Sequence, residues 1–274
     1  MTAIDVNGCR IAYREAGHGD WTLVFLHGNS MSSEIFKAQF NGLLAEKYRL
    51  LAFDLPGHGR SDNATAPEAT YTLPGYASVI RSALEQLQVI SPVMIGFSLG
   101  GNVALEMLAS GQDMAGLMII GAAPLSGDPA HLMDGFLPHI DLSFGFNDSF
   151  DDEEVEAYAQ NAFHADATTR PKFFEQDVRR TDGKARTTVI ASLATGNYAD
   201  QVALVGTNPM PLAIVFGAND ELMNTDHISS LDFANLWRGT IQTLADGHHS
   251  PFWDVPRNFD VLVNTFADQV VNTL

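Results

Sequence analysis

Gly-Phe-Ser-Leu-Gly, residues 96–100, is the stretch that decides the fold. It follows the apolar run 91–95 and precedes the helix-like segment 102–108, so we expect a strand, a sharp turn and a helix with Ser98 at the tip of the turn. Glycines on both sides suit a turn in which neighbouring chain passes very close. The helix directs its positive end and its free N–H groups at Ser98. The pattern therefore predicts a hydroxyl nucleophile beside an anion site.

Two earlier strand-like runs end in similar polar turns. The run 22–26 ends in His-Gly-Asn-Ser at 27–30, and the run 48–54 ends in a Gly/Pro cluster at 55–62. Gly28 lets the backbone pass close to a ligand. Ligands of open parallel sheets bind at the carboxyl ends of the strands, so these turns and the Ser98 turn are expected to form one site.

A serine nucleophile needs a base, and the base needs an orienting carboxylate. The apolar run 211–217 is followed by Asp220, and the run 241–244 is followed by His249. The order nucleophile, acid, histidine is one of the known chain orders of a serine triad. The sequence therefore predicts a catalytic triad of Ser98, Asp220 and one histidine of the pair His248-His249.

Longer stretches carry a resemblance to the α/β-hydrolase superfamily over nearly the whole chain. The matching stretches are H-G-N-S at 27–30, D-L-P-G-H-G-R-S at 54–61, G-F-S-L-G-G at 96–101, G-A-N-D at 217–220 and H-S-P-F-W-D-V-P at 249–256. More narrowly, the chain resembles N-acyl-homoserine lactonases of this fold. That likeness lies in M-S-S-E-I-F at 31–36 after H-G-N-S, R-T-D-G-K-A-R at 180–186 and D-F-A-N-L-W at 232–237. The resemblance implies a mostly parallel sheet flanked by helices, with a helical cap insertion.

The resemblance also orders the alternatives for the triad. It places the base two residues before a proline, as His249 stands before Pro251, and leaves His248 as a minority alternative. The sequence favours Asp220 as the acid, with Glu221 and Asp246 as fallbacks.

The remaining site predictions concern the oxyanion and the substrate. The oxyanion is expected to bind the backbone N–H groups of Asn29 and Leu99. Substrate contacts are expected from Gly28, Phe97, Phe136 and Tyr158. Tyr158 is the cap residue that we single out for a hydrogen bond to a substrate carbonyl, although a tyrosine on a half-buried helix face is also routine.

Composition limits the kinds of partner. The net charge is −18, and residues 82–169 contain no Lys or Arg. Such a face repels phosphates and nucleic acids and suits a neutral or cationic substrate, here a neutral apolar ester or lactone, although acidic charge also serves solubility. Cys9 is the only cysteine, which excludes an internal disulfide. No apolar run is long enough to span a membrane, and no signal peptide is recognisable, so we expect a cytoplasmic protein; no oligomeric state is predicted.

The chain is expected to form one structural unit. Residues 1–124 and 209–274 alternate strand-like and helical segments and form the predicted core. Helices are expected at 33–46, 71–87 and 98–110, near 225–231 and from Pro256 onward, after a first hairpin around Asn7-Gly8. Residues 125–208 form the predicted cap, with helices after 151 and at 168–181 and 184–196. Seven phenylalanines of the cap would line an apolar lid or fill the cap's own core, namely residues 136, 144, 146, 150, 163, 173 and 174.

These patterns predict a serine hydrolase of an ester or lactone, and the narrower resemblance implies N-acyl-homoserine lactone ring opening as the first hypothesis. A general carboxylesterase or a C–C bond hydrolase of the same fold is the alternative, and a non-catalytic binding protein is a third. No metal or cofactor is predicted, because the chain lacks an H-x-H-x-D-H run, a dinucleotide fingerprint and a phosphate loop.

Overall fold

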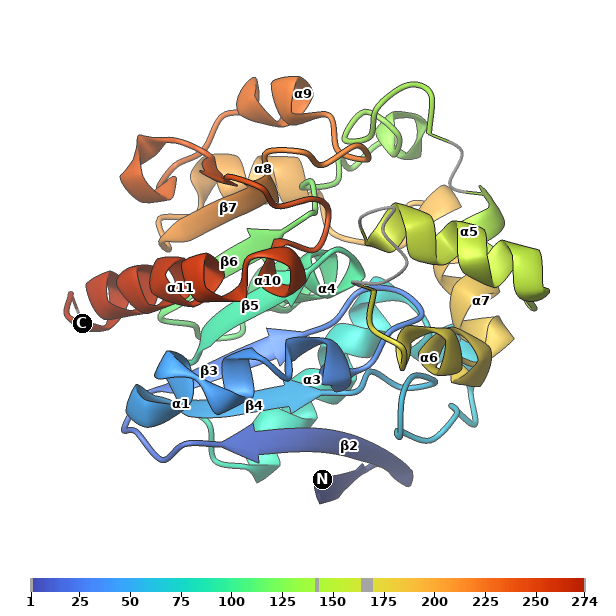
Figure 1. Cartoon of the computed structure of the whole chain (residues 1–274), viewed down its shortest axis with the longest axis horizontal. Coiled ribbons are helices and arrows are strands. Elements are labelled where there is room, and N and C mark those ends of the chain that lie inside the picture. The colour runs from blue at the N-terminus through green and yellow to red at the C-terminus, as the bar shows by residue number, and fades with distance from the viewer. Residues whose placement is uncertain (1, 141–142, 164–169, 274) are drawn as a thin grey trace.

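The computed structural model describes residues 2–140, 143–163 and 170–273. Its centre is an eight-stranded sheet in the order β1-β2-β4-β3-β5-β6-β7-β8 (Figure 1). The two pairings of β2 are antiparallel and all others are parallel. The strands are β1 (Thr2–Val6), β2 (Cys9–Ala16), β3 (Thr22–Leu26), β4 (Arg49–Phe53), β5 (Val93–Phe97), β6 (Gly116–Ile120), β7 (Leu212–Gly217) and β8 (Gln242–Leu244).

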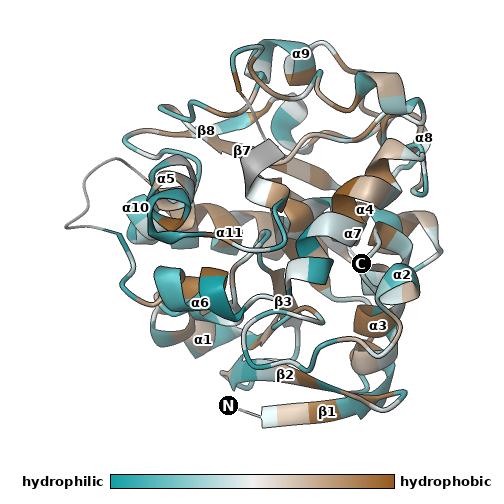
Figure 2. Cartoon of the chain, turned by 90° about the vertical axis from the view of Figure 1, so that its right-hand side faces the viewer, coloured by the Kyte–Doolittle hydropathy of each residue, from teal (hydrophilic) through white to brown (hydrophobic). Residues whose placement is uncertain are grey.

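Helices cover both faces of this sheet, which explains why the central strands are apolar along their whole length. One face carries α3 (Leu73–Gln86), α4 (Leu99–Ala109) and α8 (Gln201–Thr207), and the other carries α1 (Leu43–Lys47), α10 (Pro251–Asp254) and α11 (Pro256–Val271). Successive strand residues point to opposite faces, so Val24 packs in one core and Phe25 in the other. Figure 2 shows this apolar interior, with hydrophilic residues on the outer sides of the peripheral helices.

Local sequence signals set several of these elements. The predicted hairpin is confirmed: Asn7 and Gly8 both have positive φ, as the turn between β1 and β2 requires. Thr72 caps α3 by accepting from the Gly75 N–H, and Pro256 opens α11.

Other helix predictions were wrong or incomplete. The single helix expected at 33–46 is broken into η1 (Ser33–Phe36), η2 (Gln39–Asn41) and α1, because Gly42 has an extended backbone between the last two. The helix expected at 168–181 is the shorter α6 (Phe174–Arg180), and residues 164–169 lie outside the described part. Helices α8 and α10 were not predicted, since seven and four residues are too few for a periodic pattern. The remaining short elements are α2 (Pro67–Thr70), η3 (Pro129–His131), η4 (Ser143–Phe146), α9 (Thr225–Ser229) and η5 (Trp237–Gly239).

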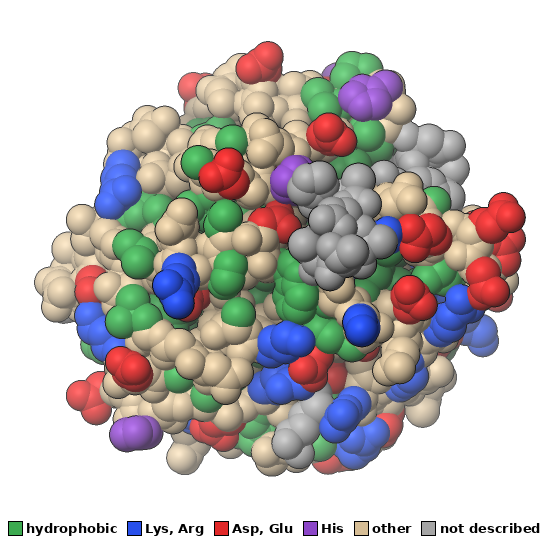
Figure 3. Space-filling model, in the orientation of Figure 1, with side chains coloured by type: hydrophobic (Ala, Val, Ile, Leu, Met, Phe, Trp, Pro, Cys, Tyr) green, Lys and Arg blue, Asp and Glu red, His purple; other side chains and the backbone are tan. Residues whose placement is uncertain are grey.

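Between β6 and β7 the chain leaves the sheet and forms α5 (Asp152–Ala162), α6 and α7 (Gly183–Ala194), here termed the cap helices. They lie beyond the carboxyl ends of the strands, at the right of Figure 1. A capping box at Asp151 and Glu154 starts α5. Figure 3 shows acidic side chains over α5 and basic side chains below them over α6, and Arg179 of α6 pairs with Asp152 of α5. In the described part of the chain, every helix is too short or too polar to cross a lipid bilayer.

Gly100 lets the start of α4 lie against the end of β3. A Cβ at this position would stand 2.3 Å from the Leu26 carbonyl oxygen. Because that atom belongs to the backbone, Gly100→Ala is expected to destabilise the fold by about 3 kcal/mol, the upper range for overpacking. Thermal and urea unfolding measure the loss.

Gly206→Ala is the matched control. A Cβ there meets only the Asp232 carbonyl oxygen, at an ordinary 3.5 Å, and α8 gains a better helix former. We expect no loss, or a gain of up to about 1 kcal/mol. Equal stability of the two variants would contradict the close packing at Gly100.

Candidate active site

Ser98 stands between β5 and α4 in a strained backbone conformation. Its φ is 50° and its ψ is −120°, in the left-handed half of the map that residues other than glycine rarely adopt. Its N–H donates to the Ile120 carbonyl over 2.8 Å, and its carbonyl accepts from the Gly101 N–H. The turn predicted around Ser98 is thus present, and it directs the side chain away from the sheet toward a cavity that Ser98 lines.

Asp220 and His249 meet although they are 29 residues apart. His249 Nδ1 donates to Asp220 Oδ2 over 3.0 Å, and the two side chains are only 9% and 1% exposed. The other carboxylate oxygen of Asp220 accepts from the N–H groups of Leu222 and Met223. Burial opposes ionisation of Asp220, but the charge and hydrogen bond of His249 and these backbone donors outweigh it and lower its pKa. The pair is therefore an ionised carboxylate that orients an imidazole.

The imidazole of His249 lies over the ends of β5 and β6. Its ring centre is 5.1 Å from that of Phe97. Gly121 has a φ of 54°, and a Cβ there would come within 2.9 Å of His249 Cε1. The glycine thus leaves room for the ring beside Ser98.

The alternative triad residues lie elsewhere. The His248 ring nitrogen Nδ1 is 3.5 Å from Asp254 Oδ2, and the backbone N–H of His248 donates to the same oxygen. Glu221 and Asp246 are exposed, and Asp246 occupies a turn with a φ of 60°. Only Asp220 among the three candidate acids contacts His249 within the described residues.

A cavity of about 100 Å³ brings the predicted residues together. Ser98 and His249 both line it, although no hydrogen bond joins them in the part of the chain described here. Such contacts often tighten only when a substrate is bound. All four predicted substrate contacts line the same cavity: Gly28, Phe97, Phe136 and Tyr158. Met31, Phe146, Ala162 and Leu222 add to its apolar wall.

Of the two predicted oxyanion donors, Leu99 directly follows Ser98, and Asn29 lines the small cavity together with Ser98. Leu99 is the first residue of α4, so its N–H has no partner within the helix. Asn29 is held from the cap side: Tyr158 Oη donates to its carbonyl over 2.9 Å, and its side-chain amide donates to the Gly145 carbonyl. The Tyr158 hydroxyl, expected on a substrate carbonyl, is therefore bound to Asn29 here.

A second cavity of about 290 Å³ is also lined by Ser98 and Phe136. Its wall includes Asn102, His131 and His227. Sequence reasoning assigned no site role to these residues, because they come from separated segments without a shared motif. Only Asn102 had a sequence signal, because it follows Ser98 by about one helical turn.

The phenylalanines between residues 125 and 208 lie in different surroundings. Phe136 and Phe146 line the small cavity. Phe163 and Phe174 are buried against each other, and Phe150 stacks on Tyr158. The side chain of Phe144 lies outside the described part. Among the described residues, no group of three His, Cys, Asp or Glu side chains converges as metal ligands do.

Asp177 of α6 binds the loop that follows β3. Ser32 Oγ donates to its carboxylate over 2.6 Å. Burial raises the pKa of Asp177 to about 7, and the charge of Asp54 also raises it. The Ser32 hydrogen bond and the charges of Arg14 and Arg60 lower it, but they do not outweigh burial. The carboxylate thus joins a cap helix to the loop that holds Asn29.

Asp177→Asn is expected to flatten the pH dependence of stability. The pKa of Asp177 is about 7 in the folded chain, against an ordinary value of 3.8. The wild type therefore loses stability as the pH rises from the lower value through the higher, and no more beyond it. Since the group is partly exposed, we expect an advantage for Asp177→Asn on the order of 2 kcal/mol at about pH 8 and almost none at about pH 4. Urea unfolding at both pH values measures it; Glu175→Gln, an exposed change on the same helix, should leave the pH dependence unaltered.

Comparison with known proteins defines the class. Residues 23–260 match the sequence model described as the alpha/beta hydrolase family. The match covers most of the 274 residues, so the chain belongs to this family, and the predicted superfamily and fold class are confirmed.

Three individual proteins show to which members of the family this chain is similar. A solved structure of the N-acyl homoserine lactonase AidH, complexed with N-hexanoyl homoserine lactone, has a TM-score of 0.93 and 31% identity, and the match covers 99% of this chain and 98% of that one. The AB hydrolase superfamily protein YisY of Bacillus subtilis (strain 168) is 24% identical over 93% of this chain and 94% of its own length. The 2-hydroxy-6-oxononadienedioate/2-hydroxy-6-oxononatrienedioate hydrolase of Pseudomonas sp is 25% identical over 97% of this chain and 94% of its own length.

Proposed function

We propose that the protein is a serine hydrolase that opens the ring of N-acyl-homoserine lactones. The observation that carries this proposal is the convergence of Ser98, at the start of α4, with the bonded pair His249–Asp220 around one largely apolar cavity. The likeness to AidH over the whole chain supports the lactone as substrate.

In this mechanism Ser98 Oγ attacks the lactone carbonyl carbon while His249 Nε2 takes the hydroxyl proton. Asp220 binds Nδ1, on the opposite edge of the imidazole, and stabilises its cation. The oxyanion accepts hydrogen bonds from the N–H groups of Leu99 and Asn29, each lowering the barrier by about 3 kcal/mol. The tetrahedral intermediate then breaks the ring C–O bond, and His249 gives its proton to the departing oxygen.

The resulting acyl-enzyme keeps the new alcohol tethered to its acyl group, so ring closure competes with hydrolysis. Water attacks the ester carbonyl, gives a proton to His249, and the proton returns to Ser98 Oγ as the acid is released. The net reaction is lactone plus water to a hydroxy acid, which ionises to a carboxylate. The acidic surface of a chain with net charge −18 favours release of that anion.

We also infer that residues 125–208 act as the cap over this site. Tyr158 of α5 and Phe146 of η4 line the small cavity with Ser98, which supports that role. The cavity wall is apolar beside the proposed nucleophile, as a neutral acyl substrate requires.

Mass spectrometry of purified enzyme with acyl-homoserine lactones of several chain lengths tests the proposal. We expect the ring-opened acid, 18 mass units above the lactone, in the presence of a chelator as well as in its absence. Nitrophenyl esters and a vinylogous 1,5-diketone acid are the comparison substrates. Cleavage of these without lactone opening would replace the lactonase by an esterase or by a C–C hydrolase, for which the 25% identical Pseudomonas relative is the supporting observation.

A further inference from the structure

Arg186 is a buried cation without an acid partner. It lies on α7, is 3% exposed, and belongs to no ion pair in the described part of the chain. Its guanidinium donates to the carbonyls of Asn147, Asp148 and Val178 over 2.6, 2.9 and 3.1 Å. Burial lowers its pKa, because the charge is removed from water, and the electrostatic effects of Tyr158, Asp148 and Asp182 oppose this shift. So costly a group is expected to serve a further purpose.

The same guanidinium reaches the loop after β3. Its Nη1 donates to Ser30 Oγ at 3.4 Å. Ser30 is fully buried and has a φ of 56°, a left-handed conformation that costs a non-glycine residue about 1 kcal/mol. Ser30 directly follows Asn29, whose carbonyl is held by Tyr158 of α5. The strained residue therefore lies where the cap and the proposed oxyanion loop meet.

We propose that Arg186 is a positioning residue for the oxyanion hole, an inference that rests on the proposed function. By binding the segments before α5 and at the end of α6 together with the Ser30 hydroxyl, it holds Ser30 left-handed. That conformation directs the chain so that the Asn29 N–H faces the cavity of Ser98. Arg186 does not touch the substrate, since it lines neither cavity next to Ser98.

These contacts depend on the planar, forked shape of the arginine guanidinium. Three carbonyls and one hydroxyl are reached from three nitrogens of one side chain. Lysine carries the same charge on one nitrogen and cannot span these acceptors. Comparing Arg186→Lys with Arg186→Met therefore separates the effect of the guanidinium shape from the effect of the positive charge.

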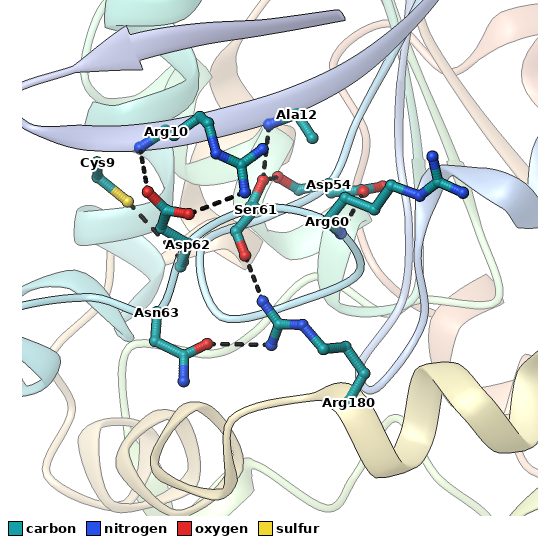
Figure 4. A network of polar contacts seen from close by, with 9 residues as sticks. All are labelled: Cys9, Arg10, Ala12, Asp54, Arg60, Ser61, Asp62, Asn63 and Arg180. Atoms are coloured by element: carbon teal, nitrogen blue, oxygen red, sulfur yellow. Dashed lines mark hydrogen bonds and ion pairs between the residues drawn. The ribbon is translucent and has the colours of Figure 1, made fainter. Parts of the chain in front are cut away.

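Arg180 provides the matched control. It also joins the cap to the core, donating to the Ser61 carbonyl over 2.5 Å and to Asn63 Oδ1 over 3.0 Å (Figure 4). These contacts lie on the loop after β4, in the network of Ser61, Asp62 and Arg10, and touch neither Asn29 nor Ser30. Arg180→Met thus removes a cap-to-core arginine without disturbing the oxyanion loop.

The experiment compares kcat, KM and labelling of Ser98 by a fluorophosphonate, with every variant assayed well below its own Tm. Arg186→Met is expected to lower kcat and the labelling rate by about 10- to 100-fold, near the loss of one oxyanion donor, with KM changed less than about threefold. Arg186→Lys should fall in between, and Arg180→Met should stay within about threefold of the wild type.

Equal kcat for Arg186→Met and Arg180→Met would overturn the inference, as would a raised KM with unchanged kcat. If Arg186→Met does not fold, Arg186→Lys decides: full kcat in that variant refutes a role for the fork. Labelling of the wild type, absent in Ser98→Ala, tests the proposed function separately. If the wild type is not labelled, the serine mechanism itself is contradicted. If the wild type is labelled but kcat and labelling are unchanged in the Arg186 variants, only the positioning role is contradicted.

Discussion

Ser98→Ala is expected to reduce turnover by about 10⁶-fold, the scale seen when a triad serine is removed. The physical reason is that, among the described residues lining the small cavity with His249, Ser98 is the only serine or threonine. Stability should hardly change, because Ser98 holds its place through backbone bonds to Ile120 and Gly101. Hydrolysis assays and thermal unfolding measure the two quantities.

Ser126→Ala is the control for this prediction. Ser126 lines the larger cavity but stands outside the turn between β5 and α4. It should keep activity within about threefold of the wild type. If Ser98→Ala retains one hundredth of wild-type turnover or more, roughly 10⁴-fold above expectation, Ser98 is not the nucleophile.

The second large effect is expected at Asp220. Asp220→Asn should lower kcat on the order of 10⁴-fold while leaving KM almost unchanged, because an amide can present its NH₂ to Nδ1 and favour the wrong imidazole tautomer. The exposed neighbours give matched controls, and Glu221→Gln and Asp246→Asn should remain near wild type. A loss in Asp246→Asn as large as in Asp220→Asn would reassign the acid.

The lowered pKa of Asp220 also predicts that the folded chain loses stability in acid. Its pKa lies below the ordinary value of 3.8, so its ionised form stabilises the folded chain above that value. This contribution is lost as the pH falls through the lowered pKa. Urea unfolding at about pH 3 and about pH 6 should show a smaller difference for Asp220→Asn than for the wild type.

The sheet was predictable because strands leave strong local patterns. The runs that became β3, β4, β5 and β7 are continuous and apolar, as buried parallel strands are. The hairpin at Asn7-Gly8 needs only its own two residues. The prediction of one helix at 33–46 was wrong, because the extended backbone at Gly42 and packing against α11 override the apolar spacing of this segment.

The site was predictable in part for the same reason. Ser98, Asp220 and His249 each follow a strand, and parallel topology brings the ends of β5, β7 and β8 to one edge. The cavity walls follow no such rule. His131 and His227 reach the larger cavity from η3 and α9, two segments far apart in the sequence.

By itself the sequence determined the strand ends, the turn at Ser98 and the family, since each depends on a few adjacent residues. Tertiary structure alone decided the electrostatics of the insertion. The cation-free span 82–169 suggests an unbalanced acidic face, yet Arg170 pairs with Glu156, Arg179 with Asp152, and Arg186 enters the interior. Charges interact through space rather than along the chain, so their balance is set only when α5, α6 and α7 pack together.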